Sequence, residues 1–276
     1  MINELKAKVK KLLIEGRVEV VLGYKTASDG KSVAACFIEK EADVDQLIWN
    51  EDCVYNLSNY LKWIKKKVAV VVKGCDARSV VGLIQEGQVK RENIVVIGIE
   101  CRGVANAEKC ESCRVNRPKF YDILIKDPAI KEAELPRKDP YLTVKEFEGK
   151  SLEERWQFWA AEFKCCIKCY ACRQVCPHCF CPTCIVDRSQ PEWIDPSPSL
   201  IGNFSWNIVR AYHLAGRCVD CGECERACPM NIPLRKINKK IEKDIKEQFN
   251  YETGFDPDSP PFLAQFSPED PGKFIL

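Results

Sequence analysis

Residues 165–184 read CCIKCYACRQVCPHCFCPTC, and residues 218–229 read CVDCGECERACP. Both stretches contain the spacing C-x2-C-x2-C-x3-C, and in both the last cysteine is followed by proline. The four thiols of the first motif are Cys166, Cys169, Cys172 and Cys176, and those of the second are Cys218, Cys221, Cys224 and Cys228. Thiols this close together in a chain are typical ligands of soft metal centres. The two motifs therefore predict metal binding in the C-terminal half.

The repeated spacing is the one with which bacterial ferredoxins bind two 4Fe–4S clusters. Three closely spaced thiolates hold three irons of one cubane, and the thiolate before the proline completes the other cluster. We therefore predict one cluster on Cys166, Cys169, Cys172 and Cys228, and a second on Cys218, Cys221, Cys224 and Cys176. Zinc is the alternative, because C-x2-C pairs also build tetrahedral zinc sites. A zinc site built from C-x2-C pairs, however, requires neither the third closely spaced cysteine nor the proline after the fourth.

The composition agrees with thiolate ligation. The 276 residues include 18 cysteines but only two histidines, His178 and His213. A disulfide framework is not expected in a reducing compartment, and the 42 basic and 40 acidic residues nearly cancel, which disfavours nucleic acid as a partner. Residues 1–16 lack the continuous apolar core that is typical of a secretory signal, and no apolar run reaches the roughly 18 residues of a membrane span. We expect a cytoplasmic protein with no membrane span.

Helical patterns surround the two motifs. Residues 151–166 begin with a Ser151–Glu154 capping box, and helices are also predicted at 204–216 and 232–249. The sequence AGRCVDCGECERACPMNIPL (215–234), with its partner motif, resembles the alpha-helical 4Fe–4S dicluster ferredoxins found in heterodisulfide reductases and in the iron–sulfur subunits of succinate dehydrogenases. The resemblance covers about residues 160–248. It implies a mainly helical domain whose paired clusters pass electrons to a neighbouring protein of the same complex.

Four further cysteines lie beside the first motif and are not needed by two clusters. With His178 as another candidate ligand, they could hold a fourth cluster or a zinc ion, or they could be packed free thiols; they are Cys165, Cys179, Cys181 and Cys184. Cys36 and Cys53 lie outside the predicted groups of metal-binding cysteines, and we expect them to be buried free thiols.

The N-terminal part has a different pattern. Short apolar runs at 18–24, 68–74, 93–100 and 121–125 predict buried strands, and residues 76–87 predict a helix with Asp76 as N-cap. A strand–helix–strand unit places its strands parallel in one sheet. We therefore predict an α/β domain with a mostly parallel sheet. The glycine-containing segment 23–32 lacks a phosphate-binding pattern and is interpreted as an ordinary loop.

Four more thiols belong to this domain. Cys75 and Cys101 each follow a predicted strand, so both should emerge at the carboxyl edge of the sheet, and the next loop carries Cys110 and Cys113. The start of a helix at Cys75 should favour its thiolate. A third 4Fe–4S cluster is the preferred interpretation; a zinc clip, or a catalytic dithiol of Cys110 and Cys113 alone, are the alternatives.

The sequences VVVKGCDARSVVGLIQEG (70–87) and IVVIGIECRG (94–103) resemble the beta subunit family of coenzyme F-420 hydrogenases and dehydrogenases. The resemblance covers about residues 68–125. It implies an iron–sulfur cluster, FAD and a deazaflavin substrate, although a flavin-binding fingerprint is not recognisable in this chain.

Together these patterns predict an α/β domain at 1–126, a linker at 127–155, a helical dicluster domain at 156–250 and an extended proline-rich tail at 251–276. The predicted function is that of an electron-transfer subunit, relaying single electrons through two to four clusters within an anaerobic multi-subunit oxidoreductase. By resemblance, its partners would be heterodisulfide-reductase-like proteins, hydrogenases, formate dehydrogenases or aldehyde oxidoreductases. One alternative is a catalytic flavin-containing beta subunit that oxidises or reduces deazaflavin or nicotinamide. The other is a zinc-stapled nucleic-acid-binding or assembly protein.

Overall fold

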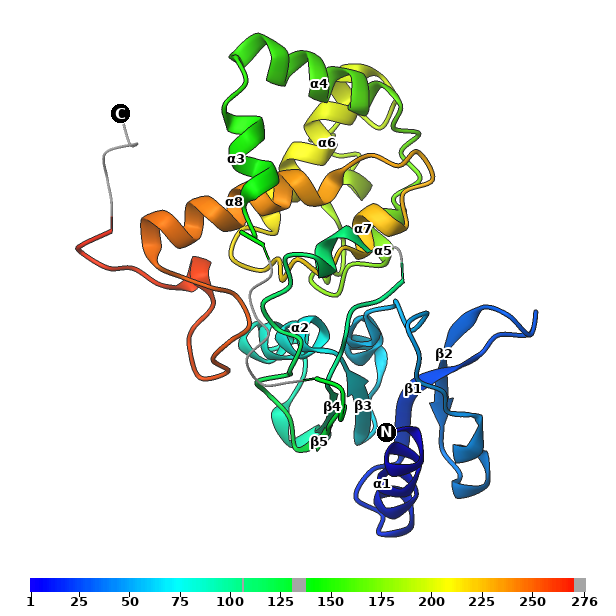
Figure 1. Cartoon of the computed structure of the whole chain (residues 1–276). Coiled ribbons are helices and arrows are strands. Elements are labelled where there is room, and N and C mark those ends of the chain that lie inside the picture. The colour runs from blue at the N-terminus through cyan, green and yellow to red at the C-terminus, as the bar shows by residue number, and fades with distance from the viewer. Residues whose placement is uncertain (106, 131–137, 271–276) are drawn as a thin grey trace. The chain divides into compact units, whose positions relative to one another are not determined.

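The computed structural model describes residues 1–105, 107–130 and 138–270 (Figure 1). The chain divides into two compact units, of which the first is Met1–Lys138 with Gly254–Ser259 and the second is Asp139–Thr253 with Pro260–Leu276. Parts of the predicted linker (131–137) and of the predicted tail (271–276) lie outside the described residues.

The first unit contains a five-stranded sheet in the order β2-β1-β3-β4-β5 (Figure 1). The strands are β1 (Val20–Thr26), β2 (Val33–Ile38), β3 (Val68–Val72), β4 (Ile94–Ile99) and β5 (Ile123–Ile125). All neighbours pair in parallel except β1 and β2, which are antiparallel. The four predicted strands and the mostly parallel sheet are thus confirmed.

Strand β2 was not predicted. It pairs with β1 as a hairpin, so part of the predicted loop at 23–32 belongs to β1. The Asp29 carboxylate accepts hydrogen bonds from the backbone amides of Lys31 (2.9 Å) and Ser32 (2.8 Å). The loop amides are therefore satisfied within the turn itself, as in an ordinary side-chain-capped turn.

Burial explains these elements. Every residue of β3 is buried, as expected of a central parallel strand. Helix α1 (Ile2–Ile14) buries Leu5, Val9 and Leu12, which lie on one face at helical spacing. Helix α2 (Gly74–Gln85) follows β3 and packs on β3 and β4. Short 3-10 turns occupy Glu41–Gln46, Leu57–Trp63, Arg91–Asn93 and Glu108–Cys110.

The described residues of the second unit are mainly helical (Figure 1). The helices are α3 (Leu142–Glu148), α4 (Leu152–Lys164), α5 (Ala171–Gln174), α6 (Leu200–His213), α7 (Glu223–Arg226) and α8 (Leu234–Phe249), with 3-10 turns at Ile185–Asp187 and Phe262–Ala264. Helix α6 packs against both α4 and α8. The apolar core of the second unit includes Phe163, Ile194, Trp206 and Ile232.

Helix α4 begins as predicted. The Glu154 amide donates to Ser151 Oγ (3.2 Å), and the Ser151 amide donates to the Glu154 carboxylate (2.8 Å), so both halves of the capping box are present.

Helix α3, in contrast, lies in a segment predicted to be a linker without helix. Its seven residues are too few to show helical periodicity in the sequence. Tertiary contacts stabilise it instead: Val144 is buried, and Glu148 forms ion pairs with Lys240 (2.7 Å) and Lys243 (3.0 Å) of α8. Within the described parts of the chain, every helix is too short or too polar to cross a bilayer.

Candidate metal centres

The two cysteine motifs of the second unit adopt the same backbone path. In each, the residues before and after the second cysteine have positive φ: Lys168 (51°) and Tyr170 (57°) in the first, Asp220 (58°) and Gly222 (74°) in the second. Left-handed residues other than glycine are uncommon. Turns of this kind direct successive backbone N–H groups into a concavity that suits anions, including iron–sulfur clusters. Each motif then continues into a one-turn helix, α5 or α7.

One predicted ligand set lines a single cavity. The sulfur-bearing residues around it are Cys218, Cys221 and Cys224 from the second motif and Cys176 from the first. The first motif's fourth cysteine therefore lies with the second motif's first three, as the crossed assignment requires. Arg210, Asp220 and Asn238 also line this cavity.

The other predicted set gathers around Cys172, which is buried in α5. Burial raises the pKa of the Cys172 thiol, the Arg210 guanidinium opposes this rise, and the nearby thiols of Cys166, Cys169 and Cys228 add to it. The neighbours of Cys172 thus include the three partners that the spacing predicts. Among the described residues, three or more Cys, His, Asp or Glu side chains are nowhere gathered closely enough to hold one metal ion. The thiols of the second set line a cavity and do not converge on a point.

Polar side chains hold the motif loops in place. The Asn203 amide group donates to the carbonyl oxygens of Phe163 (2.9 Å) and Cys166 (2.7 Å), which ties the first motif to α6. In the second motif, the Asp220 carboxylate pairs with Arg235 (2.6 Å) and Lys239 (2.9 Å) of α8. Although burial opposes ionisation, Lys239 and Arg235 hold the pKa of Asp220 well below its usual range. Both loops are therefore anchored to long helices.

The four surplus cysteines have different surroundings. Cys165 and Cys181 are exposed, and Cys184 packs against the apolar core. Cys179 lies against Cys176; its hydrogen bond with Cys176, together with burial, raises the pKa of the Cys179 thiol. His178 is buried, whereas His213 is exposed at the end of α6. A further metal on these residues stays a prediction.

In the first unit, the carboxyl edge of the sheet carries the other predicted thiols. Cys75 lies in the first turn of α2, just after β3, and Cys101 lies two positions after the last residue of β4. Backbone amides donate to three sulfurs of the predicted set: Gly103 to Cys101, Val104 to Cys110, and Val115 to Cys113, each at 3.4 Å. Hydrogen bonds to sulfur are one of the features that set cluster potentials.

The pKa values of two of these four thiols are raised. Burial raises the pKa of Cys75, and the Asp76 carboxylate and the Cys113 thiol add to the rise. Burial likewise raises the pKa of Cys101 to about 11, with Cys110 contributing. Burial and the Asp76 carboxylate thus oppose the preference for the thiolate that is expected of a helix start. A metal that binds these cysteines must displace their thiol protons. Cys36 and Cys53 are buried free thiols, as predicted.

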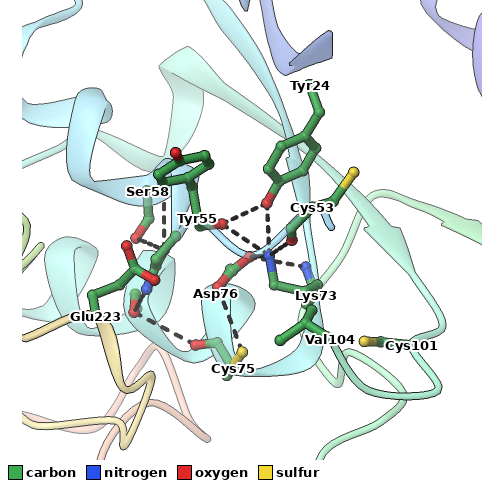
Figure 2. Close-up of polar contacts among 12 residues, drawn as sticks. Tyr24, Cys53, Tyr55, Ser58, Lys73, Cys75, Asp76, Cys101, Val104 and Glu223 are labelled. Atoms are coloured by element: carbon green, nitrogen blue, oxygen red, sulfur yellow. Dashed lines mark hydrogen bonds and ion pairs between the residues drawn. The ribbon is translucent and has the colours of Figure 1, made fainter. Parts of the chain in front are cut away.

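A buried polar network behind Cys75 was missed by the sequence analysis. Figure 2 shows the Lys73 ammonium surrounded by oxygen atoms: Tyr24 Oη at 2.6 Å, the carbonyl oxygens of Cys53 and Tyr55 at 2.9 Å each, and the Asp76 carboxylate at 2.8 Å. Lys73 and Asp76 are only 2% and 1% exposed. The helix starts at Gly74, so Lys73 and not Asp76 is the N-cap. The signal for this network in the sequence was the single charged residue Lys73 between the apolar run 68–72 and Gly74.

Comparison with known proteins gives two informative relatives. The chain is 24% identical to a protein of Methanocaldococcus jannaschii named F420-dependent formate dehydrogenase subunit beta, over 92% of each chain. It is 25% identical to F420-dependent formate dehydrogenase 1 subunit beta of Methanococcus maripaludis, over 94% of this chain and 92% of the relative. No protein-family profile matches. The chain is thus similar, over nearly its whole length, to beta subunits of oxidoreductases, which extends the resemblance noted at residues 68–125.

Proposed function

We propose that this chain is an iron–sulfur electron-transfer subunit of a multi-subunit oxidoreductase, working in the cytoplasm of an anaerobic organism. The observation that carries the proposal is the cavity lined by Cys176 together with Cys218, Cys221 and Cys224. A cysteine from one motif beside three from the other is the arrangement by which two cubanes share two ferredoxin motifs. The similarity to oxidoreductase beta subunits supports the same conclusion.

Each proposed site has a donor set that suits a cubane. Cys166, Cys169, Cys172 and Cys228 would hold one cluster, and the cavity thiols the second. Such clusters supply reversible one-electron transfer. The protein holds the ligands rigidly: Asn203 fixes the first motif to α6, and Asp220 fixes the second to α8. Contacts of this kind behind the ligands orient them and tune the metal centre.

A third cluster is proposed at the sheet edge of the first unit, on Cys75, Cys101, Cys110 and Cys113. Three of these sulfurs accept backbone N–H groups, which suits thiolates bound to iron. Gly103 supports the close approach of the loop, since a β-carbon there would lie 3.3 Å from Cys110 Cβ. Three clusters would give the protein a relay in both of its units.

Among the partners considered, a formate dehydrogenase is favoured by the names of the relatives, which are subunits of F420-dependent formate dehydrogenases. Hydrogenases, heterodisulfide-reductase-like proteins and aldehyde oxidoreductases are the other candidates. Co-purification from the native host, followed by identification of the large catalytic subunit, distinguishes them.

The decisive experiment measures iron, zinc and acid-labile sulfide per chain in anaerobically purified protein. Three cubanes correspond to about 12 irons with equal sulfide. About eight irons would limit the clusters to the two ferredoxin motifs, and about 16 would add a site on the surplus cysteines. Replacing Cys75 by alanine should remove about four irons if the third cluster exists. Zinc in place of iron and sulfide would overturn the proposal.

The second candidate function is catalytic: a flavin at the sheet edge that exchanges hydride with a deazaflavin. The naming of the relatives as F420-dependent favours it. It predicts bound FAD in the purified protein and reduction of that flavin by reduced F420. Protein with intact clusters that contains no flavin, and gains no F420 activity when FAD is added, would rule it out.

A further inference from the structure

Arg210 is a buried cation at the heart of the second unit. It lies on α6, is 4% exposed, and donates through Nη2 to the Cys172 carbonyl oxygen at 2.9 Å. Its Nε has no hydrogen-bond partner within the described residues. The arginine cannot escape burial by losing its proton, because a guanidinium stays charged in proteins.

Carboxylates do not neutralise this charge. Other arginines near the motifs are paired: Arg173 with Asp187 (2.8 Å), Arg226 with Glu223 (2.7 Å) and Arg235 with Asp220 (2.6 Å). For Arg210, none of the described acidic residues lies within ion-pair distance. A buried charge left unpaired is strongly unfavourable, so an anion of another kind is expected beside it.

The groups beside Arg210 are thiols from both predicted ligand sets. Its hydrogen bond reaches Cys172, a member of the first set, and its side chain lines the cavity of Cys176 and Cys224, members of the second. Burial opposes the charge, yet Cys176 and Cys224 together with Cys179 and Cys172 raise the pKa of Arg210. Arg210 therefore hydrogen-bonds a residue of the first set and lines the cavity of the second.

We infer that Arg210 is the counter-charge shared by the two clusters and that it sets their reduction potentials, an inference that rests on the proposed electron-transfer function. A cubane bound by four thiolates is an anion and gains a further negative charge when it accepts an electron. A fixed cation beside it stabilises the reduced state more than the oxidised state, so the potential rises. Because the guanidinium is shielded from water, salt should screen this effect only weakly.

The test compares Arg210→Gln, which replaces the charge with a neutral amide donor, with Arg210→Lys, which keeps the charge. Iron, sulfide and the EPR signals of the reduced protein are measured first, and midpoint potentials are then determined by EPR-monitored redox titration at low and high ionic strength. In Arg210→Gln, the ratio of reduced to oxidised cluster at a fixed potential should fall at least tenfold, or about 59 mV for one electron. In Arg210→Lys it should stay within about threefold of the wild type.

Arg173→Gln is the matched control. It removes the same charge one residue from Cys172, but from a pair with Asp187 in which the two side chains are 19% and 46% exposed, so solvent and salt screen the change. Its potentials should therefore shift much less than those of Arg210→Gln. If Arg210→Gln loses iron, Arg210→Met provides a second neutral variant for the comparison with lysine.

The possible outcomes distinguish the proposed electron-transfer function from the proposed role of Arg210. Wild-type protein without iron and sulfide would refute the proposed function itself. Intact clusters whose potentials are equal in the neutral and lysine variants would refute the role of Arg210 and leave the electron-transfer function standing. A shift that vanishes at high salt would also count against a buried counter-charge, because surface charges are screened in that way.

Discussion

The Lys73 ammonium lies 2.8 Å from the Asp76 carboxylate, and both side chains are buried at the N-terminal end of α2. The two residues of this ion pair flank Gly74 and Cys75 in the chain. The pair therefore fixes the turn that presents the Cys75 thiol at the carboxyl edge of the sheet, and it explains why a lysine follows an otherwise apolar strand.

Replacing Lys73 by methionine should destabilise the protein by about 3–5 kcal/mol, because it leaves the Asp76 charge buried without its partner. Denaturant unfolding of the full chain, followed by circular dichroism, measures the change. Lys66→Met is the control: Lys66 and its partner Glu39 are 52% and 56% exposed, so its loss should cost about 1 kcal/mol or less. Equal effects of the two changes would show that burial of the Lys73 pair is unimportant.

Gly74→Ala should disrupt the predicted N-terminal site. A β-carbon at Gly74 would lie 1.6 Å from the Val115 carbonyl oxygen, and Val115 follows Cys113 by two positions. The loop with Cys110 and Cys113 would have to move, at a cost of about 1–3 kcal/mol or more, and about four irons should be lost. In Gly149→Ala the nearest atom is 3.5 Å away, so this control should keep its iron and stability. Unchanged iron in Gly74→Ala would refute a cluster at this edge.

The crossed ligand assignment predicts which double variants share a cluster. Cys176→Ala and Cys221→Ala should affect the same cluster, so combining them should remove no more than about four irons per chain. Combining Cys176→Ala with Cys169→Ala should affect both clusters and remove about eight. If each motif held its own cluster, the first combination would remove about eight irons and the second about four. Cys36→Ala, which removes a buried thiol of β2, should keep all the iron.

Glu148 should make the stability of the second unit depend on pH. Hydrogen bonds and charge from Lys240 and Lys243 lower the pKa of Glu148, although partial burial opposes this. The contribution is therefore complete above the unfolded-state pKa of about 4.3 and is lost as the pH falls through the lower folded-state value. Because Glu148 is 26% exposed, the effect should be about 1 kcal/mol or less.

Denaturant unfolding of the wild type and of Glu148→Gln at pH 6 and pH 3.5 checks this. The stability difference between the two proteins should shrink on acidification. Glu247→Gln, at a site 54% exposed on the same helix as Lys243, should show a smaller difference at both values. A difference that grows at pH 3.5 would contradict the assignment of the lowered pKa.

Local sequence patterns predicted two kinds of element: helices whose capping residues lie close together in the chain, and strands that are buried on both faces. The run VAVVV identified β3 because a central strand is buried on both faces. Ser151 and Glu154 identified the start of α4 because a capping box lies within four residues. Helix α3 and strand β2 were missed, since α3 depends on ion pairs to α8 and β2 on its hairpin partner.

Local sequence patterns were enough to predict thiols in two identical spacings, a C-terminal half of helices, and a mostly parallel sheet with cysteines at its carboxyl edge. The groups that surround those thiols could not be predicted in this way and became known from the folded structure. Arg210 lies 38 positions from Cys172, and Tyr24 lies 49 positions from Lys73, yet each pair is joined by a hydrogen bond. Ligand spacing is encoded over a few residues, whereas the burial and the charge around a ligand depend on segments that meet only when the chain folds.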